Sequence, residues 1–420
     1  MLAGPMEPAP AAPAAKAPPA PFTSYQRFVV FLLAFLQFTV ILDFMILSPL
    51  GAILMPELHI TTRQFGMVVS VYAFSAGVAG LLAAGFADRF DRKKLLLFFY
   101  CGFVLGTFLC GVAGSYHFLV FARMVTGLFG GVIGSISFAI ITDLFPLQVR
   151  GRVMGIVQTA FAASQVLGIP IGWELATRLN WHAPFLLIVG ISVLAGIIIF
   201  MRLRPVDEHL KVARDRSPVA HLLHTASQSR YLIGFSATML LATGGFMLMP
   251  FGSAFSINNL GIASNKLSTV YFVTGIVSMI AGPLAGRLAD RVGKYTLFAI
   301  GTVAAIGVVI YYTHLGTTPL WLVIVISCVM FVCVSARMIA ASALTSGVPA
   351  MPDRGAYMAI NSSLQQFSGG VAAGLAGLIV VQSPSGRLER YSLLGWVVAA
   401  VMALTVVLMF NVHRIVRERP

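Results

Sequence analysis

The sequence predicts an all-α membrane protein with twelve transmembrane helices in two similar six-helix halves. Three observations carry this prediction. Hydrophobic residues make up 58% of the 420 residues and charged residues only 10%, whereas a soluble domain carries about 25% charged residues. Apolar runs of about 20 residues, the length that crosses a bilayer as a helix, recur along the whole chain. A charged loop sequence of the first half also returns in the second half.

This charged loop sequence lies at 84–94 and again at 286–294. A second pair of similar sequences, Arg150-Gly151 and Arg354-Gly355, is separated by 204 residues. Two repeats at nearly the same separation indicate an internal duplication of a unit of about 200 residues. The pairs in the charged loop that lie 202 positions apart are Asp88 and Asp290, Arg89 and Arg291, and Arg92 and Lys294.

The apolar runs place six spans on each side of a polar stretch at 203–230. The first six runs are 28–54, 66–86, 94–115, 117–142, 152–176 and 183–202. The second six runs are 231–257, 267–287, 294–314, 319–345, 355–380 and 392–412. We interpret 203–230 as a cytoplasmic linker between an N-terminal bundle at 25–202 and a C-terminal bundle at 231–413. Residues 1–24 lack the basic start and apolar core of a cleaved signal, so we expect a disordered cytoplasmic tail there and a short tail at 414–420.

Lys and Arg are distributed unevenly between the expected loops. With a cytoplasmic N-terminus, the cytoplasmic tails and loops hold 21 of the 28 basic residues. The external loops hold Arg63, Arg178, Lys266, Arg387 and Arg390. Because cytoplasmic loops carry an excess of Lys and Arg, we expect a multi-pass protein of the cell inner (cytoplasmic) membrane with both termini in the cytoplasm.

The sequence gives no support for several other classes of function. The net charge of +14 follows from the positive-inside bias, so it gives no argument for nucleic acid as a partner. The sequence has no phosphate-binding Gly-Lys-Ser/Thr loop, no catalytic triad and no metal-ligand spacing, so we expect no enzymatic activity, no cofactor and no metal site. The cysteines are expected to be buried free thiols because all of them lie inside apolar runs. They are Cys101, Cys110, Cys328 and Cys333.

Twelve spans in two halves, with a charged loop after the second and eighth spans, resemble the major facilitator superfamily. The loop signature of that family is Gly-x-x-x-Asp-Arg-x-Gly-Arg-Lys. The second copy follows it, with Lys294 in place of Arg, whereas the first copy has Ala84 in place of the leading Gly and Asp91 in place of the inner Gly. The resemblance implies two bundles around a cavity lined by helices 1, 4, 7 and 10, and alternating access by rocking of the two bundles.

Three shorter stretches resemble bacterial proton-coupled drug and sugar exporters, in particular the arabinose-efflux-like permease branch. They are 42–46 in the first span, 121–127 in the fourth span, and 168–172 in the fifth span. The second stretch is similar to a membrane-embedded Arg motif. The third is similar to the Gly-Pro motif of antiporters, although Ile169 separates Gly from Pro.

Asp43 and Arg123 are opposite charges expected at the same depth in the membrane. Asp43 lies about 22 Å from the inner end of its helix and Arg123 about 9 Å from the outer end of its helix, in an apolar layer about 30 Å thick. A charge at the bilayer centre costs at least about 2.5–3.5 kcal/mol, so each one needs a reason. We interpret the pair as a proton-coupling site, a titratable carboxylate tuned by the nearby Arg. A static ion pair that joins two helices is the alternative.

Arg337 in the tenth span is the other deep charge, and no acid is expected at its depth. If it faces a wet cavity, it indicates an anionic or strongly polar group on a substrate. Solvation by water and backbone carbonyls is the alternative. The other expected cavity residues are uncharged, and hydrogen bonding between helices is the alternative role for their amides. They are Gln37, Gln158, Gln165, Phe246, Asn361 and Gln365.

The charged loops are expected to act as a conformational latch that stabilises the outward-open state, rather than as a substrate site. Asp88 and Arg92 are predicted to join Asp143 at the inner end of helix 4. The complete set of expected latch residues is Asp88, Arg89, Arg92, Asp143, Asp290 and Arg291.

The resemblance and the deep charges together predict a secondary active transporter. We expect proton-coupled efflux, by antiport, of a small amphipathic or polar organic compound such as a drug or a sugar. An importer or a lysolipid-type carrier of the same superfamily, or a non-transporting sensor on this scaffold, is the alternative. The expected partners are the small-molecule substrate, protons and the lipid bilayer, and we expect a monomer.

Overall fold

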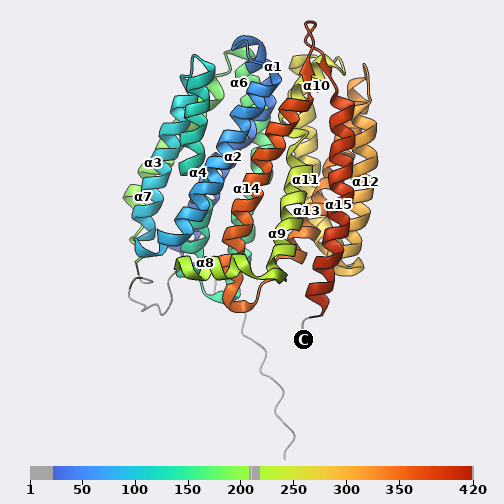
Figure 1. Ribbon diagram of the computed structural model, residues 1–420. Helices are drawn as coiled ribbons and strands as arrows, with labels where there is room; N and C mark the ends of the chain where they lie inside the picture. Colours follow the sequence, from blue (N-terminus) through green and yellow to red (C-terminus); the bar gives the residue numbers. More distant parts are fainter. Residues whose placement is uncertain (1–21, 208–209, 211–217, 419–420) are drawn as a thin grey trace, which may run out of the picture.

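The structure is a computed structural model that describes residues 22–207, 210 and 218–418. It is almost entirely helical, and the two halves of the chain form two bundles side by side (Figure 1). Positions 1–21 of the expected tail at 1–24 lie outside the described residues. The expected tail at 414–420 is helical as far as Arg417, because the last helix, α15, continues to that residue.

The first bundle begins at a capping box, in which the Thr23 side chain accepts from the Gln26 backbone N–H and Gln26 binds back to Thr23. The helices of this bundle are α1 (Ser24–Glu57), α2 (Thr62–Phe86), α3 (Arg92–Gly111), α4 (Tyr116–Leu144), α5 (Leu147–Ala163), α6 (Ile169–Arg178) and α7 (Ala183–Arg202). The 3-10 turn η1 (Ala87–Arg89) precedes α3. A π-helical turn, η2 (Ser164–Gly168), joins α5 to α6, so the expected fifth span is one interrupted helix.

The second bundle is interrupted in its first span rather than in its fifth. Its helices are α9 (Ser229–Phe246), α10 (Gly252–Asn258), α11 (Ser264–Val292), α12 (Lys294–Thr313), α13 (Leu320–Thr345), α14 (Arg354–Ile379) and α15 (Tyr391–Arg417). The 3-10 turn η4 (Met249–Phe251) separates α9 from α10, and Pro250 there cannot continue a regular helix. A second 3-10 turn, η5 (Met351–Asp353), precedes α14, and the short strands β1 (Val381–Gln382) and β2 (Leu388–Glu389) pair before α15.

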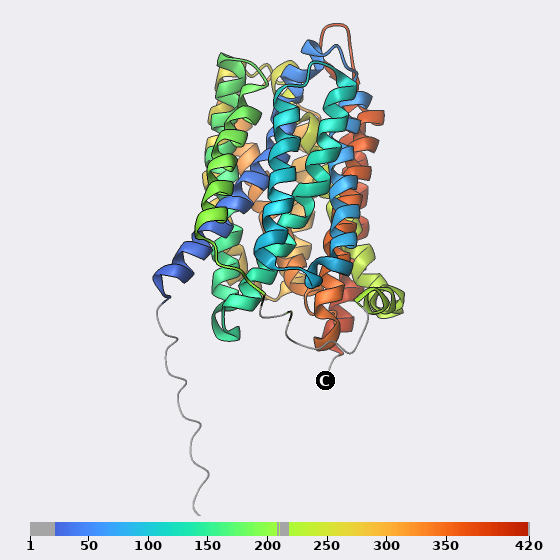
Figure 2. The same cartoon turned by 90° about the vertical axis from the view of Figure 1, so that its left-hand side faces the viewer.

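The expected linker at 203–230 contains a short helix, α8 (Pro218–Ser227). Figure 1 shows α8 lying across the two bundles near the end that carries the C-terminus, nearly perpendicular to the long helices, and Figure 2 shows the same helix end-on at one side of the molecule. It contacts α2 of the first bundle and α9 and α14 of the second. The linker therefore touches both bundles.

In the described part of the chain, eleven helical stretches are long and apolar enough to cross a membrane. Helix α14 is as long as the others but is not among them, because Asn361, Gln365 and Gln366 and several glycines lower its hydropathy. It packs along α2 of the other bundle. The approach is close: a Cβ added at Gly66 would lie 2.8 Å from the Ala373 carbonyl oxygen.

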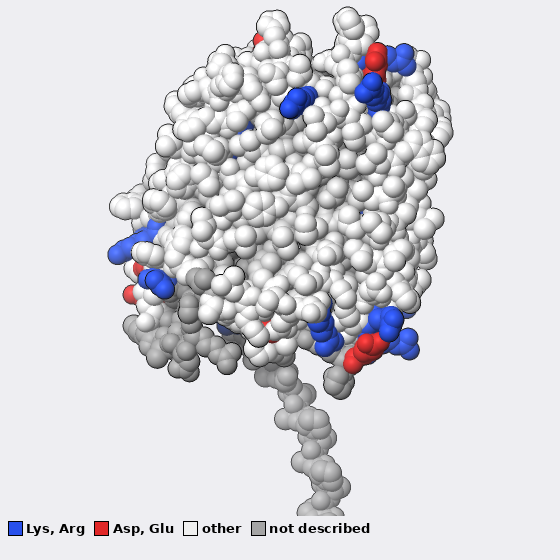
Figure 3. All heavy atoms as spheres, in the orientation of Figure 1, with Lys and Arg blue, Asp and Glu red and all other residues white. Residues whose placement is uncertain are grey.

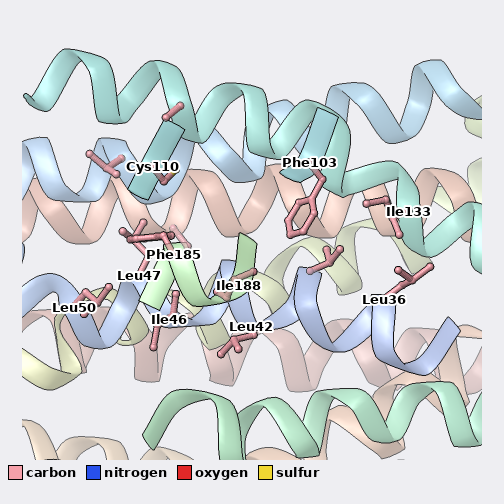
Figure 4. Packing of buried hydrophobic residues seen from close by; sticks show 14 of the residues in the cluster. Leu36, Leu42, Ile46, Leu47, Leu50, Phe103, Cys110, Ile133, Phe185 and Ile188 are labelled. Carbon is pink, nitrogen blue, oxygen red and sulfur yellow. The ribbon is translucent and has the colours of Figure 1, made fainter. Parts of the chain in front are cut away.

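The surface and the core agree with a membrane protein. On the face drawn in Figure 3, Lys, Arg, Asp and Glu gather near the two ends and leave a broad, almost uncharged belt between them. Inside the first bundle, α1 packs its apolar side chains against α3, α4 and α7 (Figure 4). Leu47 of α1, Phe103 of α3 and Phe185 of α7 are fully or almost fully buried there. Cys101 is exposed, so the expectation that all cysteines are buried is wrong for this residue.

The two bundles are joined at the end remote from Ser24 and Arg417, which we call the distal end. There Ser48 donates to the Met249 carbonyl and Thr62 donates to the Val380 carbonyl at 2.6 Å. Trp173 Nε1 donates to the Ser264 carbonyl at 2.9 Å. Within the described residues, the side-chain hydrogen bonds between the bundles all lie in this distal half. The distal end is therefore closed.

Candidate functional site

Asp43 of α1 and Arg123 of α4 form an ion pair inside the first bundle. Arg123 Nη1 lies 2.8 Å from Asp43 Oδ2, and the side chains of Arg123 and Asp43 are 1% and 0% exposed, respectively. Thr107 of α3 donates to the other carboxylate oxygen at 3.1 Å. Side chains of α3 and α4 thus hold the α1 carboxylate in a dry site. Removal of either charge there would leave the other uncompensated.

Aromatic side chains connect this pair to the second bundle. The Arg123 guanidinium lies 4.4 Å from the centre of the Tyr72 ring, a cation–π contact. The Tyr72 ring lies 5.2 Å from Phe44, and Phe44 meets Phe246 of α9 edge-on at 5.9 Å. The side chains therefore form a continuous packed path from the ion pair to the other bundle.

Small residues on the neighbouring helices make this close packing possible. A Cβ at Gly106 of α3 would lie 2.6 Å from the Thr126 backbone nitrogen of α4, and a Cβ at Gly127 would overlap the Tyr72 carbonyl oxygen. The Arg motif at 121–127 thus supplies both the charge and the glycine that brings α2 next to it. This proximity excludes water from the pair.

The Gly-Ile-Pro-Ile-Gly stretch packs directly beside Asp43. A Cβ at Gly168 or Gly172 would overlap the side chains of Leu42 and Ile46 on α1, respectively. Pro170 lies in the first turn of α6, where a missing N–H is tolerated. The stretch that resembles the antiporter motif therefore holds the α5–α6 interruption against the part of α1 that carries the carboxylate.

The uncharged residues expected in the cavity are divided between several environments. Phe246 lines a small pocket between the bundles. Gln158 is exposed on α5 whereas Gln165, which lies in the π-turn, is buried. Gln365 is half-buried. Three of these expected cavity residues have a buried side-chain oxygen with no hydrogen-bond partner in the described part of the chain, and they are Gln37, Gln165 and Asn361.

Sequence reasoning missed other residues of the pocket that contains Phe246. They include Phe44, Ser48 and Gln366. Gln366 is next to Gln365, so the correct helix was identified but not the correct face. Ser48 lies between Asp43 and Pro49 in the α1 sequence. A polar residue at that place in an apolar helix was the available signal for the pocket.

Arg337 of α13 is enclosed within the second bundle. Its side chain is 0% exposed, so the expectation that it faces a wet cavity is not met in this arrangement. Among the described residues, none of its guanidinium nitrogens has a hydrogen-bond partner. The side chain reaches α9, where Nη2 lies 3.9 Å from the position of a Cβ on Gly244.

The two charged loops have different local structures. In the first copy, Asp91 is the N-cap of α3 and accepts from the Lys93 backbone N–H at 2.7 Å. In the second copy, Gly293 occupies the same place with a φ of +94°, a conformation that favours glycine. The substitution of Asp91 for glycine in the signature therefore replaces a left-handed glycine turn with a side-chain cap.

Part of the expected latch is formed within the first bundle. Arg92 Nε lies 3.2 Å from Asp143 Oδ2, with side-chain exposures of 5% and 19%. The side chain of Asp88 lies outside what the structure describes. Arg89, Asp290 and Arg291 are exposed, and no ion pair between Asp290 or Arg291 and another described residue is present.

The chain is similar to known transport proteins. It is 26% identical over 267 residues to the uncharacterized MFS-type transporter YceJ of Bacillus subtilis, which covers 63% of this chain and 67% of that protein. It is 33% identical over 153 residues to Multidrug resistance protein 3 of the same organism, which covers 36% of this chain and 30% of that protein.

A solved structure has the same fold. A bacterial homolog of the human lysosomal transporter Spinster, in an inward-facing and unoccupied conformation, matches with a TM-score of 0.70 at 14% identity, over 94% of this chain and 97% of that chain. The family model described as Major Facilitator Superfamily matches residues 33–346 and 234–420. With its two helical bundles and its deep charges, this chain belongs to the major facilitator superfamily.

Proposed function

We propose that the protein is a proton-coupled secondary transporter that exports a small amphipathic or polar organic compound, such as a drug or a sugar, in exchange for protons. The observation that carries this proposal is the dry Asp43–Arg123 pair and its packed path to Phe246. An ionisable residue inside the membrane is costly, and in transporters such residues mark proton relays and substrate paths. The match to a multidrug resistance protein supports export as the direction.

The coupling step begins with a proton on Asp43. When the carboxylate is charged, it binds the Arg123 guanidinium at 2.8 Å. When it is protonated, this attraction is lost and the guanidinium is free to bind other acceptors. Arg123 Nε has no hydrogen-bond partner among the described residues, so the guanidinium has unused donor capacity. The two protonation states thus differ in the interactions that any ligand-driven switch requires.

The conformational step is the opening of the distal end. Movement of Arg123 changes its contact with Tyr72, and Tyr72 packs on Phe44, which packs on Phe246 of the second bundle. Phe246 lies next to the α9–η4 break, close to the Ser48–Met249 hydrogen bond that closes the distal end. With both termini in the cytoplasm, this closed distal end corresponds to an inward-facing state.

Transport into sealed vesicles tests the proposal. The purified protein is reconstituted into proteoliposomes, and uptake of a panel of radiolabelled drugs and sugars is measured with and without an imposed pH gradient. Substrate accumulation that requires the gradient and collapses with a protonophore supports the proposal. Binding of a compound with no flux under any gradient would refute it and favour a sensor. Accumulation driven by the gradient of opposite sign would indicate an importer.

A further inference from the structure

The Arg337 guanidinium is a buried cation for which the described part of the chain provides no partner. Its side chain is 0% exposed, and Nε, Nη1 and Nη2 all lack hydrogen bonds to the described residues. An unpaired charge in a low-dielectric interior is strongly destabilising. An apolar side chain of similar volume would avoid this cost, so the buried charge calls for an anionic partner that the described residues do not provide.

The internal duplication identifies what stands opposite this cation. The helix ends of the two halves correspond at a separation of about 202 residues: α1 and α10 end at Glu57 and Asn258, and α3 and α12 begin at Arg92 and Lys294. The separations of these two pairs are 201 and 202 residues, and they place Asp43 in correspondence with Gly244 or Gly245. The corresponding position thus carries a carboxylate in the first bundle and a glycine in the second. The two guanidiniums do not correspond, because Arg337 lies 214 residues after Arg123, but each faces this position from a neighbouring helix.

Helix α9 presents backbone rather than a side chain to the guanidinium. A Cβ on Gly244 would make ordinary contacts with the Met402 side chain at 3.4 Å and with Arg337 Nη2 at 3.9 Å. The next residue, Gly245, is exposed and has no atoms within 4 Å of its Cβ position. Helix α9 therefore presents no side chain between Arg337 and its exposed face. An anionic group reaches the fully buried guanidinium only when the helices packed around it separate during the transport cycle.

We propose that Arg337 binds a carboxylate or phosphate group of the transported compound, which takes the role beside Arg337 that Asp43 takes beside Arg123. A guanidinium suits this role because it binds either group through two parallel hydrogen bonds. The inference rests on the proposed transport function and narrows its substrate class to anionic amphipathic compounds. The first bundle would then titrate its own carboxylate, and the second would receive that of the substrate.

Melting curves of the full-length protein in detergent test this inference without any proton gradient. The soluble probes are benzoate, neutral benzamide as its control, and inorganic phosphate. Dioctanoyl phosphatidic acid tests whether the anion comes from a lipid. We expect benzoate or phosphate to raise the melting temperature of the wild type, benzamide to have no effect, and Arg337→Met to weaken the anion's apparent Kd about tenfold or more.

A matched pair of substitutions at Gly244 separates charge from volume. Gly244→Asp supplies an internal carboxylate, so it should raise the melting temperature above that of Gly244→Asn and abolish protection by the anions. Gly244→Asn has nearly the same size and should retain most of that protection. A Gly244→Asp protein that is less stable than Gly244→Asn, or that still binds benzoate or phosphate normally, would overturn the inference.

The remaining outcomes are equally decisive. Protection by phosphatidic acid alone would overturn the assignment to a transported substrate and identify a lipid site. A wild-type protein that accumulates substrate under a pH gradient but is protected by none of the anions would refute this inference while leaving the transport function intact. Conversely, the anions could protect the protein in a way that depends on Arg337 while no gradient-driven flux is seen. That result would support the binding site and refute the transport function.

Discussion

The Arg123 guanidinium lies over the face of the Tyr72 ring at 4.4 Å while it binds the Asp43 carboxylate. One cation is therefore shared between a carboxylate on α1 and an aromatic ring on α2. The ring face attracts the cation without removing its charge. Tyr72 consequently orients the guanidinium in a site that water does not reach.

The first prediction concerns this ring. Tyr72→Leu removes the cation–π contact, which is worth about 2 kcal/mol in a desolvated site, and it also breaks the path to Phe44. We expect a lower melting temperature and slower gradient-driven transport. Tyr72→Phe keeps the ring and serves as the control, so it should stay close to the wild type in both measurements. Equal losses in the two variants would show that the hydroxyl, and not the ring, is important.

The second prediction concerns pH and the linker. His221 of α8 lies 2.9 Å from Asp353, and Tyr231 donates to the same carboxylate at 2.8 Å. The bonds from His221 and then Tyr231 lower the pKa of Asp353 below its ordinary value. A lowered pKa stabilises the folded state above the ordinary value, and this contribution is lost as the pH falls through the lowered value. Asp353→Asn should therefore cost at most about 1 kcal/mol at neutral pH.

Melting temperatures between pH 7 and pH 3 check this prediction. The difference between the wild type and Asp353→Asn should shrink as the pH falls. Glu418→Gln is the control, because the Arg414–Glu418 pair is 64% exposed on both sides at 3.5 Å and should contribute little at any pH. A difference for Asp353→Asn that stays constant over this range would contradict the argument.

The third prediction concerns closure of the distal end. Trp173→Phe keeps an aromatic ring but removes the donor to the Ser264 carbonyl. Loss of one hydrogen bond, worth about 1 kcal/mol, should raise the population of the distally open state about fivefold. In a protein without native cysteines, maleimide labelling of Ala73→Cys in the pocket between the bundles measures this opening. Thr177→Val is the control, since its hydroxyl bonds only within α6, and faster labelling there too would refute the closure argument.

The fourth prediction concerns orientation. The beginning of α1, helix α8 and the end of α15 all lie at the same end of the bundles (Figures 1 and 2), so tags at the N-terminus, within 203–230 and at the C-terminus should face the same compartment. The distribution of basic residues predicts the cytoplasm. Protease protection in right-side-out vesicles checks this. Cleavage of the linker tag from outside would show that the topology is the reverse of the predicted one, and the inward-facing assignment would then be wrong.

The sequence was sufficient for the spans, the duplication and the meeting of Asp43 with Arg123. These features depend on length, composition and depth, which are properties of a single helix in a bilayer. It was not sufficient to predict which face each helix turns toward the neighbouring helices. The π-turn that contains Gln165 leaves no simple signal, and the burial of Arg337 depends on how the neighbouring helices pack around it. Those features arise from packing between helices, where a single residue decides whether a side chain is covered.

The last prediction concerns the coupling residue itself. Asp43→Asn resembles the protonated carboxylate permanently, so proton binding can no longer change the interaction with Arg123. We expect loss of uphill export driven by a pH gradient, while substrate binding and downhill exchange persist. Arg123 would then be a buried charge without its carboxylate, so a lower melting temperature is also expected. The free energy of unfolding should fall by about 3–5 kcal/mol if no other acceptor compensates.

The double variant separates coupling from folding. Asp43→Asn with Arg123→Met removes both charges and should recover much of the lost stability, since a buried pair replaced by uncharged groups of similar volume is often neutral. It should still fail to concentrate substrate. If Asp43→Asn vesicles accumulate substrate under a pH gradient at the normal rate, the proton is carried by another group. If the stable double variant regains uphill transport, the pair is structural, because only a folding role would be rescued by removing both charges.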